Sequence, residues 1–247
     1  MSAATEPVLV IGARSDIARA IATEYARVGH PLWLAARNAT GSNRDAADLA
    51  LRTDAEVQSF DLDVTDLAAH DAFLAALPST PATVVCAVGF LGDQEADAGD
   101  MDATQMVVAT NFTGPALLLE KLAARMSERP GKSAIIGISS VAGDRGRAKN
   151  YVYGSAKAGF SAYLSGLRQK YAATGLQIMT VKPGFVRTSM TEGMDLPGPL
   201  TTDPDSFAAR VVKAQRAGRV IYYDLRWRVL MSIIRLLPEK IFMKTKF

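Results

Sequence analysis

The chain has 247 residues, of which 49% are hydrophobic, and a formal net charge of +3. This length and apolar content are sufficient for one large buried core, so we expect a single domain. The sequence contains no apolar run of about 18 residues and no basic N-terminal region followed by an apolar run. We therefore expect a cytoplasmic protein without a membrane-spanning helix.

Cysteine and histidine are scarce in this sequence. Cys86 is the single cysteine and lies in the apolar run 82–88, which favours a small buried hydrophobe and excludes an intramolecular disulfide or a cysteine-based zinc site. His30 and His70 are isolated, so we expect neither a metal site nor a histidine-dependent triad. Basic residues are concentrated at the C-terminal end, which is not typical of a nucleic-acid binder.

Short apolar runs alternate with segments of helical pattern. The runs at 8–11, 32–36, 83–88, 134–138 and 178–181 indicate strands buried on both faces, and helices are expected over 16–28, 66–77, 102–128 and 151–173. This alternation predicts an α/β fold with a doubly wound, Rossmann-type parallel sheet. We expect a domain over 1–225, a loop over 187–204, and an amphipathic helical tail over 226–247.

The first expected strand leads into a turn that is a candidate phosphate site. It reads Gly12-Ala13-Arg14-Ser15-Asp16-Ile17-Ala18, where backbone N–H groups and a helix N-terminus can face a pyrophosphate. Asp16 and Ala18 stand where further glycines are usual. Asp16 brings a negative charge toward the phosphates unless its carboxylate caps the helix. An ordinary helix N-cap without any ligand is the alternative.

The next two strands predict the cofactor preference. Arg37 ends the second strand where an acidic residue would bind a ribose 2′-hydroxyl, so its guanidinium favours the 2′-phosphate of NADPH over NADH. Arg14 is a candidate second charge, and Asp63, followed by Val64, is placed to meet an adenine amino group. The alternatives are that both arginines are merely solvated and that Asp63 is a turn or cap residue.

A candidate reaction centre lies in the second half of the chain. Tyr153 and Lys157 are four residues apart, so both side chains leave one face of a helix, and a nearby ammonium favours the tyrosine phenolate. Ser140 follows an expected strand at the sheet edge where ligands bind, and Asn111 lies on the long helix. The alternative for Tyr153 and Lys157 is an exposed pair on a helix surface. The alternative for Ser140 and Asn111 is a role as a cap or turn residue.

Together these motifs resemble the short-chain dehydrogenase/reductase family from Val8 to about Thr188. The resemblance implies that Tyr153 is the general acid or base, that Lys157 holds the nicotinamide ribose and lowers the Tyr153 pKa, and that Ser140 orients the carbonyl. It also implies a relay water supported by Asn111. Further cofactor contacts would come from Gly89, Pro183, Val186 and Thr188. The stretch Cys86-Ala87-Val88-Gly89 lacks the asparagines of the family pattern.

The tail at 226–247 has six basic residues and one acidic residue, so the rest of the chain is slightly negative. Its apolar residues recur at helical spacing from Trp227, and Pro238 should break the helix. A basic amphipathic segment fits an anionic membrane surface. Packing on the body, or on a second subunit of a homo-oligomer, is the alternative.

Within the family, the tail and the stretches 89–93 and 183–190 are similar to the decaprenylphosphoryl-2-keto-ribose reductase subgroup. This resemblance implies a lipid-linked keto-sugar substrate, a role in cell-wall synthesis and a partner flavin oxidase. Two rival functions remain. One is a soluble ketone or 3-oxoacyl reductase, and the other is a non-catalytic nucleotide sensor or scaffold.

Overall fold

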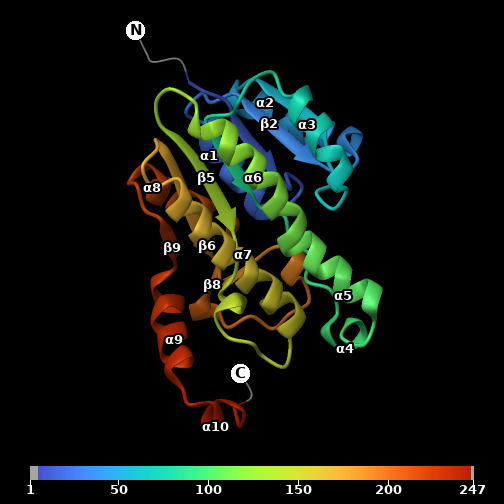
Figure 1. The fold of residues 1–247 in the computed structure, drawn as a ribbon, viewed down its shortest axis with the longest axis vertical. Helices are drawn as coiled ribbons and strands as arrows, with labels where there is room; N and C mark the ends of the chain where they lie inside the picture. Colours follow the sequence, from blue (N-terminus) through green and yellow to red (C-terminus); the bar gives the residue numbers. More distant parts are fainter. Residues whose placement is uncertain (1–4, 246–247) are drawn as a thin grey trace.

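A computed structural model describes residues 5–245, apart from the side chains of 39–45. Within these residues, seven parallel strands form one sheet in the order β3-β2-β1-β4-β5-β6-β9 (Figure 1). The strands are β1 (Val8–Ile11), β2 (Leu32–Ala36), β3 (Val57–Asp61), β4 (Thr83–Cys86), β5 (Ser133–Ile138), β6 (Leu176–Lys182) and β9 (Ile221–Tyr223). A two-stranded sheet pairs β7 (Phe185–Val186) with β8 (Thr201–Thr202). Lys246, which belongs to the basic tail, lies outside the described residues.

Helices connect the strands as crossovers. The α-helices are α1 (Asp16–Ala26), α2 (Ala39–Thr53), α3 (His70–Ala76), α4 (Gln94–Asp97), α5 (Met101–Val108), α6 (Gly114–Ser127), α7 (Tyr151–Lys170), α8 (Pro204–Arg216), α9 (Leu225–Leu236) and α10 (Glu239–Phe242). Four short 3-10 turns are η1 (Leu67–Ala69), η3 (Val141–Asp144), η4 (Ser189–Thr191) and η5 (Gly198–Leu200). A π-helical turn, η2 (Ala109–Thr113), joins α5 to α6.

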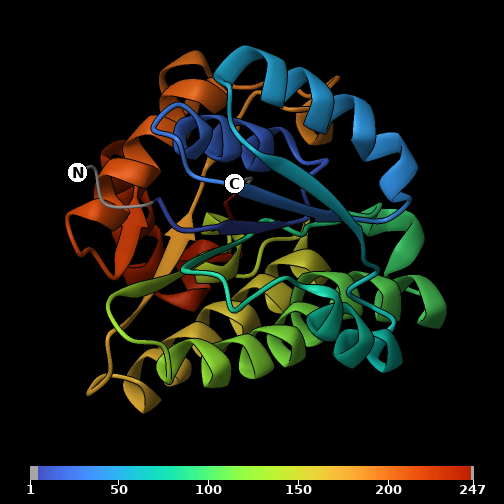
Figure 2. The same ribbon diagram turned by 90° about the horizontal axis from the view of Figure 1, so that it is seen from above.

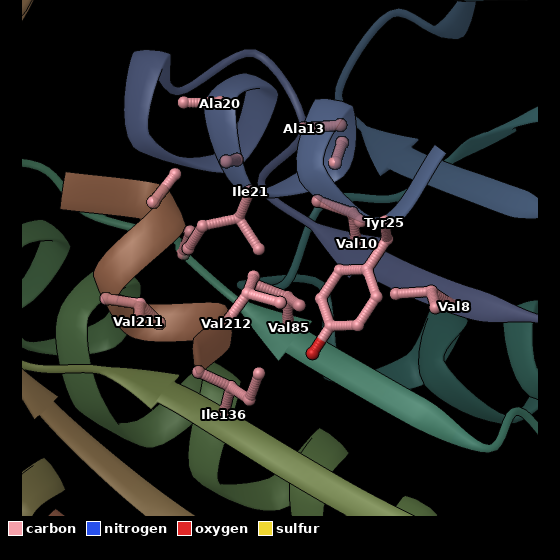
Figure 3. Packing of buried hydrophobic residues seen from close by; sticks show 14 of the residues in the cluster. Val8, Val10, Ala13, Ala20, Ile21, Tyr25, Val85, Ile136, Val211 and Val212 are labelled. Atoms are coloured by element: carbon pink, nitrogen blue, oxygen red, sulfur yellow. The ribbon is translucent and has the colours of Figure 1, made fainter. Parts of the chain in front are cut away.

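The helices form one layer on each face of the sheet, as Figure 2 shows. One apolar core lies between the sheet and α1, α2 and α8, and a second lies between the sheet and α3, α6 and α7. Figure 3 shows Ile21 of α1 and Val212 of α8 pointing toward Val85 of β4 in the first core. Because strands β1, β2, β4 and β5 are covered on both sides, their sequences are apolar runs without alternation. The predicted doubly wound α/β fold is confirmed.

The strand order reverses next to β1, which pairs with β2 on one side and with β4 on the other. In open α/β sheets, ligands bind in the crevice at the carboxyl ends of the strands at such a reversal. The loops that follow β1, β4, β5 and β6 meet at this edge, and they carry the residues expected in the site.

The structure differs from the expected elements in four places. The helix expected over 102–128 is interrupted by the π-helical turn η2, so Asn111 does not lie in regular α-helix. Helix α2 and strand β9 were not expected. The loop expected over 187–204 contains the short strands β7 and β8 and the turns η4 and η5.

The C-terminal tail forms α9 and α10, which Pro238 separates as expected. Trp227, Met231 and Ile234 of α9 are buried in a small third core with Val141. Arg145 holds the end of the helix, since its guanidinium donates to the carbonyls of Ile234, Arg235 and Leu237 and lies 2.6 Å from a Glu239 carboxylate oxygen. One face of the tail therefore packs on the body of the protein.

Candidate active site

Helix α7 places Tyr153 and Lys157 one turn apart at the edge where the strand order reverses. Lys157 is 2% exposed, and its Nζ lies 5.8 Å from the centre of the Tyr153 ring. Nζ donates hydrogen bonds of 3.1 Å to the carbonyls of Val88 and Ile138, which follow β4 and end β5. Burial lowers the Lys157 pKa to about 8, because the ammonium is removed from water.

The Tyr153 hydroxyl shares a hydrogen bond with Ser140. Burial raises the pKa of Tyr153 to about 12, against the opposing effects of the Ser140 bond and the positive charge of Arg147. Ser140 is itself fixed, since its Oγ accepts a hydrogen bond of 3.1 Å from the N–H of Ala142 at the start of η3. The Tyr153 pKa is therefore raised, and not lowered by Lys157 as the resemblance implies, so the hydroxyl that faces Ser140 keeps its proton at neutral pH.

Asn111 is fully buried in the π-helical turn. Its amide donates to the carbonyls of Phe90 and Val107, at 2.6 and 2.8 Å, and its Oδ1 accepts from the Phe90 N–H at 3.1 Å. A side chain added at Gly89 would point at Asn111 Oδ1 and Lys157 Nζ, 3.6 and 3.8 Å from its Cβ. Asn111 therefore holds the 89–90 backbone beside Lys157. The relay water predicted at Asn111 stays a prediction.

Ser140, Tyr153 and Lys157 line one pocket together with several apolar residues, whereas Asn111 is not part of its lining. The lining includes Ile17 and Ser15 from the glycine turn, Gly89 and Leu91 after β4, Ser140 and Val141 after β5, Tyr153 and Lys157 of α7, Pro183, Val186, Thr188, Met190 and Met194 after β6, and Trp227 of the tail. The structure thus brings Ser140, Tyr153, Lys157, Gly89, Pro183, Val186, Thr188, Ser15 and Ile17 together.

The turn expected to bind phosphate requires a glycine and makes one unusual contact. Gly12 has φ +80°, and a Cβ there would lie 2.9 Å from the Val88 backbone nitrogen, so glycine is required on both counts. Ser15, the N-cap of α1, makes no side-chain cap bond. The Asp16 carboxylate does not cap the helix either. It accepts hydrogen bonds from the N–H and hydroxyl of Ser189, at 2.7 and 2.9 Å.

Arg14 and Arg37 are exposed near this end of the sheet. Arg37 lies 4.0 Å from Asp63, a distance at which two exposed side chains interact weakly. Asp63 accepts hydrogen bonds from the N–H and hydroxyl of Thr65, at 2.9 and 2.7 Å. Burial raises the Asp63 pKa, but the Thr65 bonds and the Arg37 charge outweigh it and hold that pKa below its usual value. Val64 is buried and its carbonyl accepts a bond from His70.

The expectations for Cys86, for a metal site and for a membrane-spanning helix can each be compared with the structure. Cys86 is buried in the second core, as expected, and burial raises its thiol pKa to about 11. In residues 5–245, no three or more side chains of His, Cys, Asp and Glu form a group that could hold a metal. None of the described helices is both long and apolar enough to cross a bilayer.

Comparison with known proteins identifies the family. Residues 6–196 match the family described as short chain dehydrogenase. The chain belongs to the short-chain dehydrogenase family. It is 38% identical over 237 residues to an uncharacterized oxidoreductase of Mycobacterium tuberculosis, covering 94% of each chain. An NADP-dependent 3-hydroxy acid dehydrogenase of Schizosaccharomyces pombe is 28% identical over 190 residues, which cover 74% of this chain and 73% of that protein.

Solved structures agree on the fold. A short-chain dehydrogenase of Sphingobium yanoikuyae in complex with NADPH superposes with a TM-score of 0.80 at 23% identity, covering 95% of this chain and 97% of that chain. The protein is accordingly an oxidoreductase of the short-chain dehydrogenase family, with a Rossmann-type sheet.

Sequence reasoning missed several pocket residues of this short-chain dehydrogenase, and three of them are large or polar. Arg147 and Asn150 lie between η3 and α7, and Trp227 comes from the tail. Trp227 lies so close to Gly184 that no Cβ fits there, and its Nε1 donates to the Leu200 carbonyl at 2.7 Å. Arg147 and Asn150 could have been suspected from their closeness to Tyr153 in sequence. No local pattern distinguishes Trp227 from other apolar positions of the tail.

Proposed function

We propose that this short-chain dehydrogenase is an NADPH-dependent reductase that interconverts a ketone and a secondary alcohol. The observation that carries the proposal is the Tyr153 hydroxyl, which is hydrogen-bonded to Ser140 and shares one pocket with the buried Lys157, whose Nζ lies 5.8 Å from the centre of the Tyr153 ring. These are the groups that a carbonyl needs: one to orient its oxygen, one to protonate it, and a charge to stabilise the phenolate that remains.

The residues present fit a dinucleotide. Gly89 has no side chain, so the space beside Lys157 stays open, and the first turn of α1 has no side-chain cap. Arg14 and Arg37 would hold the phosphates, Lys157 the ribose, and Val186 and Thr188 the carboxamide. The NADPH in the Sphingobium structure and the NADP dependence of the yeast relative support the choice of NADP. An adenine contact by Asp63 belongs to the same proposal.

In the reducing direction, the bound nicotinamide supplies the hydride to the carbonyl carbon. Ser140 donates a hydrogen bond to the carbonyl oxygen and Tyr153 gives it a proton, so that the product is a neutral alcohol and the phenolate is left behind. Lys157 stabilises that phenolate by its charge. Asn111 acts through the backbone at residues 89–90, which it holds in place.

The proposal is tested by NADPH oxidation over a panel of ketones, with Tyr153→Phe as the variant. Removal of a general acid should reduce turnover about 10²- to 10⁴-fold. The dissociation constant of NADPH should change little. Near-normal turnover of the variant would remove Tyr153 from this role. Absence of hydride transfer from the unmodified protein across the whole panel would instead favour a nucleotide-sensing or scaffold protein.

For the substrate, we propose a lipid-linked keto-sugar on a polyprenyl phosphate, as the subgroup resemblance implies. A partner flavin oxidase in cell-wall synthesis would then supply the ketone. The pocket supports an amphipathic substrate, because Leu91, Val141, Met190 and Trp227 line it beside the polar residues. The test is turnover of a polyprenyl-phosphate 2-keto-pentose with NADPH and with NADH. If only 3-oxoacyl or simple ketone substrates react, the soluble-reductase alternative replaces this one.

A membrane-surface role for the tail belongs to the same proposal. The outward face of α9 is apolar, since Leu225, Val229, Ile233 and Leu236 are each more than half exposed. Arg226, Arg228 and Arg235 lie on the same helix. An exposed apolar stripe with basic neighbours is complementary to an anionic lipid surface. We propose that this face binds the inner surface of the membrane, where a polyprenyl phosphate would be held.

Flotation with anionic and with neutral vesicles tests the tail. The unmodified protein should float with anionic vesicles, and Val229→Glu with Ile233→Glu should abolish flotation. Leu51→Glu is the control, because Leu51 is an exposed apolar residue on α2, away from the tail. The membrane proposal fails if the protein stays in the soluble fraction. It also fails if the double variant instead dissociates a homo-oligomer, which would assign this face to a second subunit.

A further inference from the structure

The pocket contains a charged residue, Arg147, that has no role in the proposed reaction. It lies in the segment between η3 and α7, six residues before Tyr153, and lines the same pocket. Its charge acts on the Tyr153 hydroxyl. The Asn150 N–H donates to the Arg147 carbonyl at 3.0 Å, and this turn sets Arg147 and Asn150 side by side at the pocket wall.

The side chains that line the pocket carry a net positive charge. Among the described residues that line it, two are basic, Arg147 and Lys157, and none is Asp or Glu. Lys157 Nζ donates two hydrogen bonds to backbone carbonyls and would hold the nicotinamide ribose. Arg147 is the other basic residue of the lining, and the proposed reaction gives it no role.

Burial of Arg147 is unfavourable for its charge. Desolvation lowers the Arg147 pKa, although the guanidinium keeps its proton at neutral pH. Interactions with Tyr223 and Tyr153 oppose this desolvation only in part, and an anion that enters with the substrate would stabilise the guanidinium further. The Oδ1 atom of Asn150, a hydrogen-bond acceptor, is buried in the same wall without a partner among the described residues, so it would pair with a donor such as a substrate hydroxyl and not with the anion itself. This wall therefore fits a polar end of the substrate and not its hydrocarbon part.

We propose that Arg147 determines substrate specificity by binding a negatively charged group, a carboxylate or a phosphate, close to the carbonyl that is reduced. The proposal rests on the proposed reductase function, and it selects acidic carbonyl compounds among the possible substrates. The fork of the guanidinium suits the two oxygens of either anion.

The experiment compares acids with their uncharged esters. The probes are 2-, 3- and 4-oxopentanoate and the three methyl esters, so that the distance from carboxylate to ketone varies by one bond at a time. The variants are Arg147→Met, which removes the charge, and Arg147→Lys, which keeps it. Lys149→Met is the matched control, because Lys149 is an exposed basic residue two positions away that does not line this pocket.

For the best-spaced acid, the unmodified protein should show a higher kcat/KM than for its ester. Arg147→Met should lower the acid-to-ester ratio about 10- to 100-fold, which corresponds to the loss of a charged hydrogen bond. Arg147→Lys should retain part of the ratio, and Lys149→Met all of it. An unchanged ratio in Arg147→Met, with both rates reduced equally, would overturn the proposal and leave Arg147 with an effect on Tyr153 alone.

Binding separates this proposal from the reductase proposal. Isothermal titration of the acids into the NADP⁺-saturated protein should show a weaker dissociation constant in Arg147→Met, whether or not the probes turn over. If no probe turns over but the acids bind through Arg147, the specificity proposal stands while the proposed reaction fails on these ketones. If no acid binds the unmodified protein, or if Arg147→Met binds the acids equally well, the specificity proposal is wrong.

Discussion

The carboxylate of Asp16 accepts two hydrogen bonds from Ser189, one from its N–H and one from its hydroxyl. Asp16 begins α1 in the glycine turn, and Ser189 begins η4 in the segment after β7. The two residues are 173 positions apart in sequence. This contact connects the expected phosphate-binding turn to the segment that covers the pocket.

Asp16→Ala should loosen the segment after β7. Arg187 is exposed there, so trypsin should cleave the variant after Arg187 several-fold faster than the unmodified protein. Asp16→Asn is the matched control, since its amide oxygen still accepts hydrogen bonds. Electrophoresis with mass spectrometry of the fragments measures the rate. Equal cleavage of Asp16→Ala and the unmodified protein would show that this contact does not hold the segment.

The pKa of Lys157 predicts how stability depends on pH. The ammonium has its ordinary pKa in the unfolded chain and a pKa of about 8 in the folded protein. Between these values the unfolded chain binds more protons, so the free energy of unfolding should rise with pH from about 8 to 10.5. The full rise should be roughly 3.5 kcal/mol, at about 1.4 kcal/mol per pKa unit.

Urea unfolding of the protein and of Lys157→Met, without cofactor, measures this effect. The difference in unfolding free energy between the two proteins isolates Lys157, because the other titrating groups are shared. The unmodified protein should gain stability relative to Lys157→Met as the pH rises through this window. A difference that stays constant from pH 7 to pH 10.5 would contradict a lowered Lys157 pKa.

The position of Arg37 indicates which of the two nicotinamide cofactors should bind more tightly. Its side chain is 65% exposed and its contact with Asp63, at 4.0 Å, is weak, so the guanidinium can approach a 2′-phosphate. The unmodified protein should bind NADPH more tightly than NADH, and Arg37→Asp should reverse this order. Arg37→Ala should weaken NADPH alone. Equal affinities for both cofactors in the unmodified protein, measured by titration, would defeat this assignment.

Because Trp227 lines the pocket, we expect the tail to contribute to substrate binding. Trp227→Phe removes the donor to the Leu200 carbonyl and should lower the free energy of unfolding by about 1–3 kcal/mol. It should also change the KM for the carbonyl substrate. Met231→Leu is the control, because Met231 is buried on the same helix but does not line the pocket. If both variants leave KM unchanged, Trp227 does not contact the substrate.

The sequence predicted the elements whose signal is local. Strands β1 and β2 are short apolar runs between turn residues, and their bounds agree with the prediction. The spacing of Tyr153 and Lys157 needs only the geometry of one helix. Strand β9 has three residues, too few for a periodic signal, and the π-helical turn at Asn111 keeps the apolar pattern of its neighbours.

Contacts between distant segments could not be predicted. The alternatives for Asp16 were a charge near the phosphates or a helix cap, whereas the carboxylate binds a residue of another segment. Trp227 belongs to a helix whose apolar stripe indicates burial but not against which surface. Arg147 sits in a connection without periodicity, so its closeness to Tyr153 in sequence raises a suspicion that only the fold turns into a place in the pocket lining.

The segment 144–147 joins the tail to the pocket, with Arg145 bound to the end of α9 and Arg147 at the pocket wall. The tail is therefore not expected to pack correctly when it alone is transferred to another member of the family. The recipient would also need an arginine at the position of Arg145 and a gap like that at Gly184 to receive the indole. Chimeras that exchange 144–147 together with 225–242 should therefore fold better than chimeras that exchange the tail alone.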